Sequence, residues 1–266
     1  MPIVKVKPGQ KIKLAKINPA DTGAFDDKGQ AKKQLKKNIE RMAELQNILY
    51  AEGRHALLIV LQAMDAGGKD GTIRSIMSGV NPQGVGVTSF KKPTEAELAH
   101  DFLWRIHQAV PAQGMIGIFN RSHYEDVLVV RVHNLVPRAI WQTRYDHINN
   151  FEKLLSENGV TILKFYLHIS QDEQKERFQA RLDQPHKRWK FNPADLEERA
   201  YWNDYMRAFE VAFEKCSPEY APWHIVPANN KWYRNLLISE TIIKALEELN
   251  LKYPKPVEGL DDLVIE

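Results

Sequence analysis

The chain has 266 residues, of which 43% are hydrophobic and 27% charged, and 37 Lys and Arg against 34 Asp and Glu give a formal net charge of +3. This composition excludes a disordered chain, a collagen-like fibre and a small disulfide scaffold. The single cysteine, Cys216, excludes an intrachain disulfide, and no apolar run approaches the roughly 18 residues of a membrane span, so we expect a cytoplasmic protein that does not contact membranes.

The charge is unevenly distributed along the chain. Residues 1–41 hold 11 Lys or Arg against 4 Asp or Glu, whereas residues 42–266 hold 26 against 30. The body of the protein is therefore not a basic nucleic-acid binder by bulk charge. We predict a basic N-terminal arm at residues 1–30, which either contacts an anionic partner or is solvated, one domain at 31–252, and an acidic C-terminal tail at 253–266.

The first predicted elements surround a glycine-rich turn. Apolar residues at helical spacing predict a helix over 32–51, which Gly53 ends. The continuous apolar run 56–61 is typical of a strand that is buried on both faces of a parallel sheet. A polar turn over 62–71 follows, and Thr72 opens the next helix.

Strands and helices then alternate to the end of the chain. Further strands are predicted at 85–90, 115–119, 160–169 and 223–226, and further helices at 94–109, 123–132, 138–158, after Ser170, at 195–216 and at 235–250. This alternation predicts a three-layer α/β/α fold with a mostly parallel sheet.

The segment Leu57–Thr72 resembles a phosphate-binding loop. A buried strand leads into Gly67, Gly68 and Lys69, and a helix begins directly afterwards. Glycines allow backbone N–H groups to surround phosphate oxygens, and the helix N-terminus adds positive potential. The usual pattern G-x-x-x-x-G-K-[ST] is altered here, because Ala63 replaces the first Gly and Asp70 follows the Lys. A tight strand–helix turn with a solvated Lys69 is the structural alternative.

The altered loop predicts a metal ligand at another position. The Ser or Thr after the Lys normally binds Mg²⁺, and the nearest hydroxyl here is that of Thr72. Asp65 lies inside the loop, where an isolated carboxylate would repel phosphate. A carboxylate suits this position if it holds a divalent cation, Mg²⁺ or alternatively Mn²⁺, that bridges to the phosphates.

Polar residues also follow the strand at 115–119. Asn120 occupies the place where P-loop enzymes usually carry an acidic residue, and it is expected to bind a cation weakly or to hydrogen-bond a nucleotide. Arg121 follows it at the sheet edge where open α/β sheets bind ligands, which suits an anion clamp. Glu125 and Asp126 are further candidates, and either is equally consistent with a solvated helix start.

A cationic segment is predicted to form a lid over about 174–200. Gln174–Lys190 carries six Lys or Arg against two acids, with Arg177 and Arg181 on one helix face. P-loop kinases carry their lid after the corresponding strand, where its cations reach the transferring phosphoryl group. The alternative is a solvated basic face. The remaining candidate cations of this edge are Lys187, Arg188 and Lys190 in the lid, and Lys91 and Lys92 after the second strand.

Taken together, the segments 62–72, 119–126 and 177–190 resemble the family-2 polyphosphate kinases over roughly residues 30–250. The resemblance implies a P-loop kinase fold like that of thymidylate kinase and Mg²⁺-dependent, reversible phosphoryl transfer between inorganic polyphosphate and adenine or guanine nucleotides. It also implies a homodimer or homotetramer.

Roles carry over to individual residues of this sequence. Asp65 resembles the metal-linked catalytic carboxylate, Arg121 a phosphate clamp, and Arg177 and Arg181 catalytic lid cations. Asn120 resembles the subclass that also phosphorylates nucleoside monophosphates, and with Arg121, Glu125 and Asp126 it forms the expected nucleotide site. The expected phosphate-binding residues are Ala66, Gly67, Gly68, Lys69, Asp70, Gly71, Thr72, Lys91, Lys92, Lys187, Arg188 and Lys190.

Two other functions compete with this prediction. An ATP-dependent nucleoside or nucleotide kinase would share the fold and the loop, although Asp65 and the missing hydroxyl at position 70 disfavour it. A nucleic-acid-binding module would depend on the basic arm and not on Lys69. A scaffold without activity is disfavoured because each phosphate-contacting position of the loop is occupied.

Overall fold

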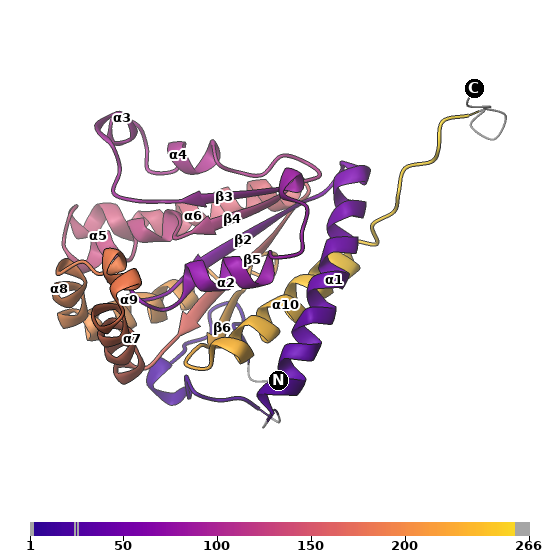
Figure 1. Cartoon of the computed structure of the whole chain (residues 1–266). Helices are drawn as coiled ribbons and strands as arrows, with labels where there is room; N and C mark the ends of the chain where they lie inside the picture. Colours follow the sequence, from indigo (N-terminus) through magenta and orange to yellow (C-terminus); the bar gives the residue numbers. More distant parts are fainter. Residues whose placement is uncertain (1–2, 24, 26, 259–266) are drawn as a thin grey trace.

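The computed structural model describes residues 3–23, 25 and 27–258, and its centre is a six-stranded sheet (Figure 1). The strand order is β1-β6-β5-β2-β4-β3, and every pair is parallel except β1 with β6. The strands are β1 (Val4–Lys5), β2 (Ala56–Gln62), β3 (Val85–Ser89), β4 (Ile116–Asn120), β5 (Val160–His168) and β6 (Trp223–Pro227). The predicted three-layer α/β/α fold with a mostly parallel sheet is confirmed.

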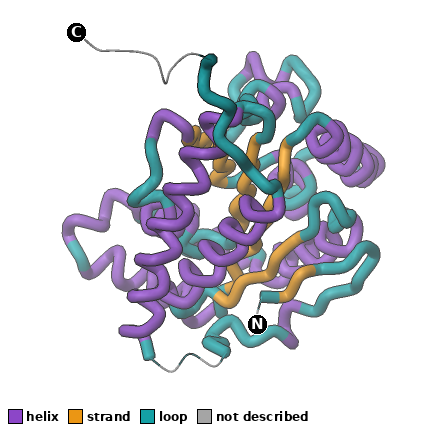
Figure 2. The backbone as a smooth tube through the Cα atoms, turned by 90° about the vertical axis from the view of Figure 1, so that its right-hand side faces the viewer, coloured by secondary structure: helices purple, strands orange, loops and turns teal. Residues whose placement is uncertain are grey.

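Helices cover both faces of the sheet, as the view from the side also shows (Figure 2). Side chains of β2 alternate between two cores: Leu58 and Val60 pack on the side of α6 and α9, whereas Leu57 and Ile59 pack on the side of α1 and α10. The helices are α1 (Lys28–Glu52), α2 (Lys69–Ile76), α3 (Glu95–Leu98), α4 (Trp104–His107), α5 (Val129–Val132), α6 (Arg138–Glu157), α7 (Gln171–Asp183), α8 (Ala194–Ala200), α9 (Trp202–Lys215) and α10 (Lys231–Glu248).

Several helix bounds differ from the sequence prediction. The helix expected over 94–109 forms two short pieces, α3 and α4, because the side chain of Asp101 accepts the backbone N–H of Leu103 at 2.9 Å and competes with helical bonding. The helix expected over 123–132 is likewise a 3-10 turn followed by α5. Helix α1 starts at Lys28 instead of residue 32, and two further helices also start earlier than predicted, α2 at Lys69 and α10 at Lys231. The earlier starts of α2 and α10 matter because both helices begin at the pocket described below.

The N-terminal segment packs against the sheet and is not a solvated arm. Val4–Lys5 pairs with β6, and Val6, Ile12 and Leu14 are buried in the core. Glu210 on α9 accepts the backbone N–H of Leu14 at 2.9 Å. Of the two alternatives for the arm, the solvated one does not hold for this part, because apolar residues between the lysines are buried in the core. Residues 253–258 of the predicted acidic tail are described as exposed chain, and 259–266 lie outside the described residues.

A buried ionic network supports the strand end that leads to the site. Nζ of Lys164 on β5 donates to Glu152 at 2.5 Å, to Tyr124 Oη at 2.7 Å and to the carbonyl of Cys216 at 2.8 Å. Burial opposes the charge of Glu152, but Lys164 and His123 outweigh it and hold the pKa of Glu152 below its ordinary value. The network fixes the turn that carries His123 and Tyr124, directly after Arg121.

No helix within the described ranges is both long and apolar enough to cross a bilayer.

Candidate active site

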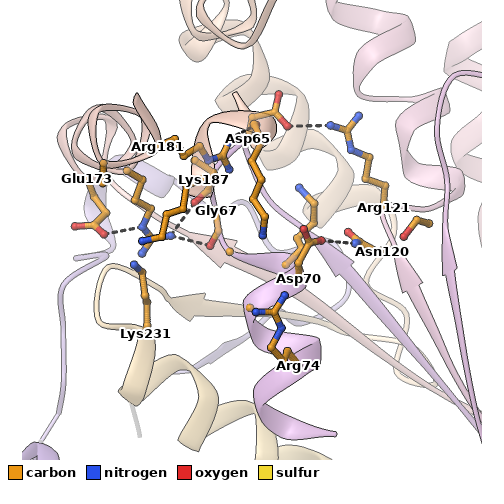
Figure 3. Close-up of a pocket in the computed structure, with 18 of the residues that line it drawn as sticks. Asp65, Gly67, Asp70, Arg74, Asn120, Arg121, Glu173, Arg181, Lys187 and Lys231 are labelled. Atoms are coloured by element: carbon orange, nitrogen blue, oxygen red, sulfur yellow. Dashed lines mark hydrogen bonds and ion pairs between the residues drawn. The ribbon is translucent and has the colours of Figure 1, made fainter. Parts of the chain in front are cut away.

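The principal pocket lies where the parallel strands end, at the edge of the sheet that binds ligands in open α/β folds (Figure 3). Its volume is about 960 Å³. Its walls come from the loop after β2, from α2, from the ends of β3 and β4, from the lid helix α7 with the 3-10 turn that follows it, and from the start of α10. The sequence segments singled out above therefore converge on one site.

The pocket carries a large excess of positive charge. Eleven Lys or Arg residues line it against four Asp or Glu. A pocket for one phosphate needs far fewer cations, so this excess suits a ligand with several anionic groups. The cations are Lys69, Arg74, Lys91, Lys92, Arg121, Arg177, Arg181, Lys187, Lys190, Lys231 and Arg234, and the acids are Asp65, Asp70, Glu173 and Glu176.

The loop after β2 requires its glycines. Gly68 adopts φ of +101° as the N-cap of α2, a conformation that side chains rarely adopt. A Cβ at Gly67 would overlap Ala63 and the carbonyl of Met64, which accepts the backbone N–H of Gly67 at 2.9 Å. Ala66 is also left-handed, with φ of +59°. This tight path presents the first N–H groups of α2 to the pocket.

Arg177 of α7 holds the phosphate loop in place through hydrogen bonds. Its Nη1 donates to the carbonyls of Ala66 and Gly67, both at 2.9 Å, and its Nη2 donates to Ala228 at 2.6 Å and to Asn229 at 3.2 Å. Nε donates to Glu173 at 2.6 Å. All five N–H donors are thus used within the protein. The structure places Arg177 in the pocket wall, where it orients the loop, and leaves it no spare donor for a phosphate.

Asp65 and Arg121 form the centre of the site. Nη2 of Arg121 donates to Oδ1 of Asp65 at 2.9 Å. Arg121 has φ of +63°, and its backbone N–H bonds to the carbonyl of Leu61 at the end of β2. Left-handed backbone at a residue with a long side chain is uncommon and concentrates at functional sites. The side chain of Arg121 remains 41% exposed and is therefore accessible to a ligand.

Lys69 is the cation at the start of α2. Its Nζ donates to the carbonyl of Ala63 at 3.1 Å and retains further donors. Burial, followed by the neighbouring Arg121, lowers the pKa of Lys69 below its ordinary value. A bound phosphate would add negative charge to that of Asp65, Glu125 and Asp70 and favour the charged form of Lys69.

Asp70 and Asn120 form a hydrogen-bonded pair across the pocket. Nδ2 of Asn120 donates to Oδ1 of Asp70 at 2.7 Å. Asp70, which replaces the usual Ser or Thr, is thereby hydrogen-bonded to Asn120, which replaces the usual acidic residue. A carboxylate at position 120 would repel Asp70, so the two departures from the common pattern depend on each other.

A second, smaller pocket of about 210 Å³ meets the first at Asp65 and Arg121. Its wall carries the carboxylates of Glu125, Asp195 and Glu198 as well as apolar and aromatic residues, among them Met64, Leu128 and Phe209. Two pockets that share a carboxylate and a guanidinium allow two ligands to meet at one point.

Three predicted residues lie outside both pockets. Thr72 is fully buried and its hydroxyl donates to the carbonyl of Gly68 at 3.1 Å. Arg188 is exposed and donates to the carbonyl of Leu182. Asp126 accepts from Arg144 at 2.8 Å, and burial raises its pKa to about 6 despite this partner. The structure thus brings the other predicted residues together but not these three.

Several residues of the site were not predicted. Lys231 and Arg234 line the pocket from α10, and Arg74 from α2. Gln174 Nε2 also donates to the backbone carbonyl of Asp65 at 2.9 Å. The sequence does contain a signal for Lys231 and Arg234, because two cations three residues apart follow β6 at the same edge of the sheet. They were overlooked because the helix was expected to start only at residue 235.

The donor set fits a magnesium ion that binds together with a phosphorylated ligand. Within the described ranges no group of three or more His, Cys, Asp or Glu is arranged to hold a metal. Mg²⁺ commonly takes only one or two protein carboxylates and completes its shell with water and substrate phosphates. Asp65 is such a carboxylate, and it lies at the junction of the two pockets.

A parallel sheet, a glycine loop that runs into a helix and a cationic helical lid define a P-loop kinase fold. The family model described as polyphosphate kinase 2 matches residues 25–254, which is most of the chain. The protein therefore belongs to the polyphosphate kinase 2 family.

Similar proteins support this membership over nearly the whole length. The AMP/ADP-polyphosphate phosphotransferase of Meiothermus ruber is 55% identical over 263 residues, which are 98% of each chain. The ADP-polyphosphate phosphotransferase of Rhodopseudomonas palustris is 46% identical and covers 94% of this chain and 91% of its own. The crystal structure of polyphosphate kinase 2 from Arthrobacter aurescens TC1 superposes with a TM-score of 0.93 at 48% identity and covers 97% of this chain and 93% of its own.

Replacing Arg177 separates loop positioning from phosphate binding. Arg177→Met leaves two carbonyls of the loop and two carbonyls after β6 without their donor. We therefore expect the free energy of unfolding to fall by about 2 kcal/mol or more, and kcat to fall with it. Arg181→Met is the matched control, because Arg181 lines the pocket from the same helix; it should mainly raise KM. Chemical denaturation and steady-state kinetics measure both. If Arg177→Met keeps full stability and raises only KM, Arg177 contacts the substrate instead.

Proposed function

We propose that the protein transfers phosphoryl groups from inorganic polyphosphate to AMP and ADP, forming ADP and ATP, in a reaction that also runs in reverse. The observation that carries this proposal is the excess of cations around a phosphate loop whose Asp65 and Arg121 are shared with a second pocket. The names of the M. ruber and R. palustris relatives support the same donor and acceptors. GMP and GDP are further acceptors in this proposal.

The two pockets suit two different substrates. The large cationic pocket suits the polyphosphate donor, since a chain of phosphates needs positive charge along its length and little apolar surface. The smaller pocket suits the acceptor nucleotide, because Met64, Leu128 and Phe209 offer apolar surface to a base or sugar. The acceptor phosphate would then point toward Asp65 and Arg121.

The protein contributes mainly orientation and charge to such a transfer. The N–H groups at the start of α2 and the ammonium of Lys69 would bind oxygens of the transferring phosphoryl group. Arg121, which reaches both pockets, would neutralise charge that develops between the incoming and leaving oxygens. Arg181, Lys187 and Lys190 of the lid face the same space and would exclude water when the lid closes.

Asp65 would hold Mg²⁺, which when bound neutralises phosphate charge at the junction of the pockets. Mn²⁺ prefers similar oxygen ligands and is an alternative. The homodimer or homotetramer implied by the sequence resemblance and the cytoplasmic location stay predictions.

Two features of the structure disfavour the two competing functions. An ATP-dependent kinase would place a base at the far end of the donor pocket, where this chain carries Lys187 and Lys231 instead. A nucleic-acid module would use the basic N-terminal segment, but part of that segment is committed to β1 and to core packing. Both observations favour polyphosphate as the anionic ligand.

Incubation of the protein with polyphosphate, AMP and Mg²⁺, without ATP, tests the proposal. We expect ADP and then ATP to form. Lys69→Ala should lower the rate by about 100-fold or more with the fold retained. Lys244→Ala changes the net charge equally on an exposed part of α10 and is the control. Chromatography of the nucleotides measures the products. The absence of ADP with wild-type protein would contradict the proposal.

The acceptor preference is tested at position 120. Asn120→Asp places a carboxylate beside Asp70 and next to Arg121, toward which the acceptor phosphate is proposed to point. We therefore expect kcat/KM for AMP to fall by about tenfold, which corresponds to about 1.4 kcal/mol, and that for ADP to fall less. Asn120→Ser, which is neutral, is the control and should keep the ratio of the two values near that of wild type. An equal loss for AMP and ADP in Asn120→Asp would show that position 120 does not select the acceptor.

A further inference from the structure

A buried arginine on α10 faces the phosphate loop with part of its guanidinium unpaired. Arg234 is only 2% exposed and lines the large pocket. Its Nε and Nη2 both donate to Oδ1 of the adjacent Asn235, at 3.0 and 2.8 Å. Nη1 has no hydrogen-bond partner among the residues that the structure describes. A buried donor without a partner is uncommon in folded proteins and calls for an explanation.

The unpaired end of Arg234 is directed at the start of α2. A Cβ added at Gly68 would overlap Nη1 of Arg234, and one added at Gly71 would lie 3.9 Å from Nη2. Gly68 is therefore needed both for its left-handed backbone and for the close approach of this side chain. The free donors of Arg234 point to the place where the loop holds its anion.

Arg234 also lacks a negatively charged partner. Asn235 is neutral, and the charged group that acts on Arg234 most strongly is another cation, Arg177. Burial, and after it Arg177, lowers the pKa of Arg234 to about 9. Arg177 differs from Arg234 in this respect, because the charge of Arg177 is paired with that of Glu173. A buried charge without a counter-ion is unfavourable, so an arginine with a purely structural role would be expected to have such a partner.

Further cations continue the path from Arg234 away from the reaction centre. Lys231 lies one helical turn before Arg234, and the pKa of Lys231 is lowered first by burial and then by cationic neighbours that include Arg177, Arg234 and Lys187. Lys231 and Lys187 lie on the opposite side of the pocket from Arg121 and Asn120 (Figure 3). A ligand that extends from Arg121 past Gly68 in this direction meets Arg234, Lys231 and Lys187, with Glu173 and Glu176 as the acids on this side of the pocket.

We propose that Arg234 is a donor-binding residue: it binds a phosphoryl group of the polyphosphate chain beyond the one that is transferred, where the chain leaves the loop toward Lys231 and Lys187. This inference rests on the proposed function. The bound phosphoryl oxygens accept hydrogen bonds from Nη1 and supply the counter-charge that the protein itself does not. Arg234 therefore acts on the polyphosphate donor and not on the nucleotide.

Arg234→Met tests the assignment, because methionine keeps an unbranched apolar stem and removes the charge. We expect KM for polyphosphate to rise about 10- to 100-fold, while KM for AMP changes by less than about twofold. At one fixed concentration, tripolyphosphate should raise the melting temperature of wild type clearly more than that of the variant. Without ligand, the variant should melt no lower than wild type, because an uncompensated buried charge has been removed. Lys244→Met, on the exposed side of the same helix, is the control for net charge.

Arg234→Lys is the second variant, since it keeps the charge and loses the planar fork of donors. It should raise KM for polyphosphate less than Arg234→Met does. If Arg234→Met does not fold, the lysine variant decides alone: a raised KM for polyphosphate with an unchanged KM for AMP supports the assignment, and an unchanged KM for polyphosphate overturns it.

A structural role predicts the reverse pattern. If Arg234→Met melts well below wild type without ligand and keeps the tripolyphosphate shift, the assignment is overturned. Wild-type protein that forms no ADP from AMP and polyphosphate overturns the proposed function itself. Active wild type with unaffected Arg234 variants overturns only the assignment of Arg234.

Discussion

The site depends on one side chain, Arg177, that ties the phosphate loop to two other parts of the fold. Its guanidinium joins the carbonyls of Ala66 and Gly67 to those of Ala228 and Asn229 after β6. The lid helix α7, which carries Arg177, is thereby connected to the loop and to the start of α10. Arg177 thereby couples the lid helix to the loop through two hydrogen bonds and to the segment after β6 through two more. The positions of Asp65 and Lys69 follow from the path that this arrangement gives the loop.

Charge imbalance is the second constraint on the site. The pocket gathers far more cations than acids, and two of its cations, Lys69 and Arg234, have pKa values lowered first by burial and then by a neighbouring arginine. Such a cluster opposes folding unless an anion compensates it. The ligand is therefore expected to stabilise the protein as well as to occupy the site. The rest of the chain carries enough acidic residues to keep the net charge at +3.

The sequence was sufficient for the architecture and for the centre of the site. The apolar run of β2 and the alternation of strands and helices predicted the parallel sheet, the glycines after β2 predicted the loop, and the cationic segment 174–190 predicted the lid, because these signals are local. The sequence was not sufficient where the role of a side chain depends on contacts with residues that are distant in the chain. Arg177 was predicted to bind phosphate, and only the folded chain brings four backbone carbonyls within its reach. Arg188, Thr72 and Asp126 likewise lie outside the pockets and form hydrogen bonds with other groups of the protein. Arg234 was missed because its role depends on the close approach of α10 to Gly68.

The central claim is that the pocket is a track for a polyanion and not a site for a single phosphate group. Calorimetric titration of the wild-type protein with orthophosphate, pyrophosphate, tripolyphosphate and longer polyphosphate, at one fixed salt concentration, tests it most directly. The account predicts that affinity per chain increases with each added phosphate until the chain spans the cations from Arg121 to Lys231. Equal affinity for pyrophosphate and for long polyphosphate would contradict it.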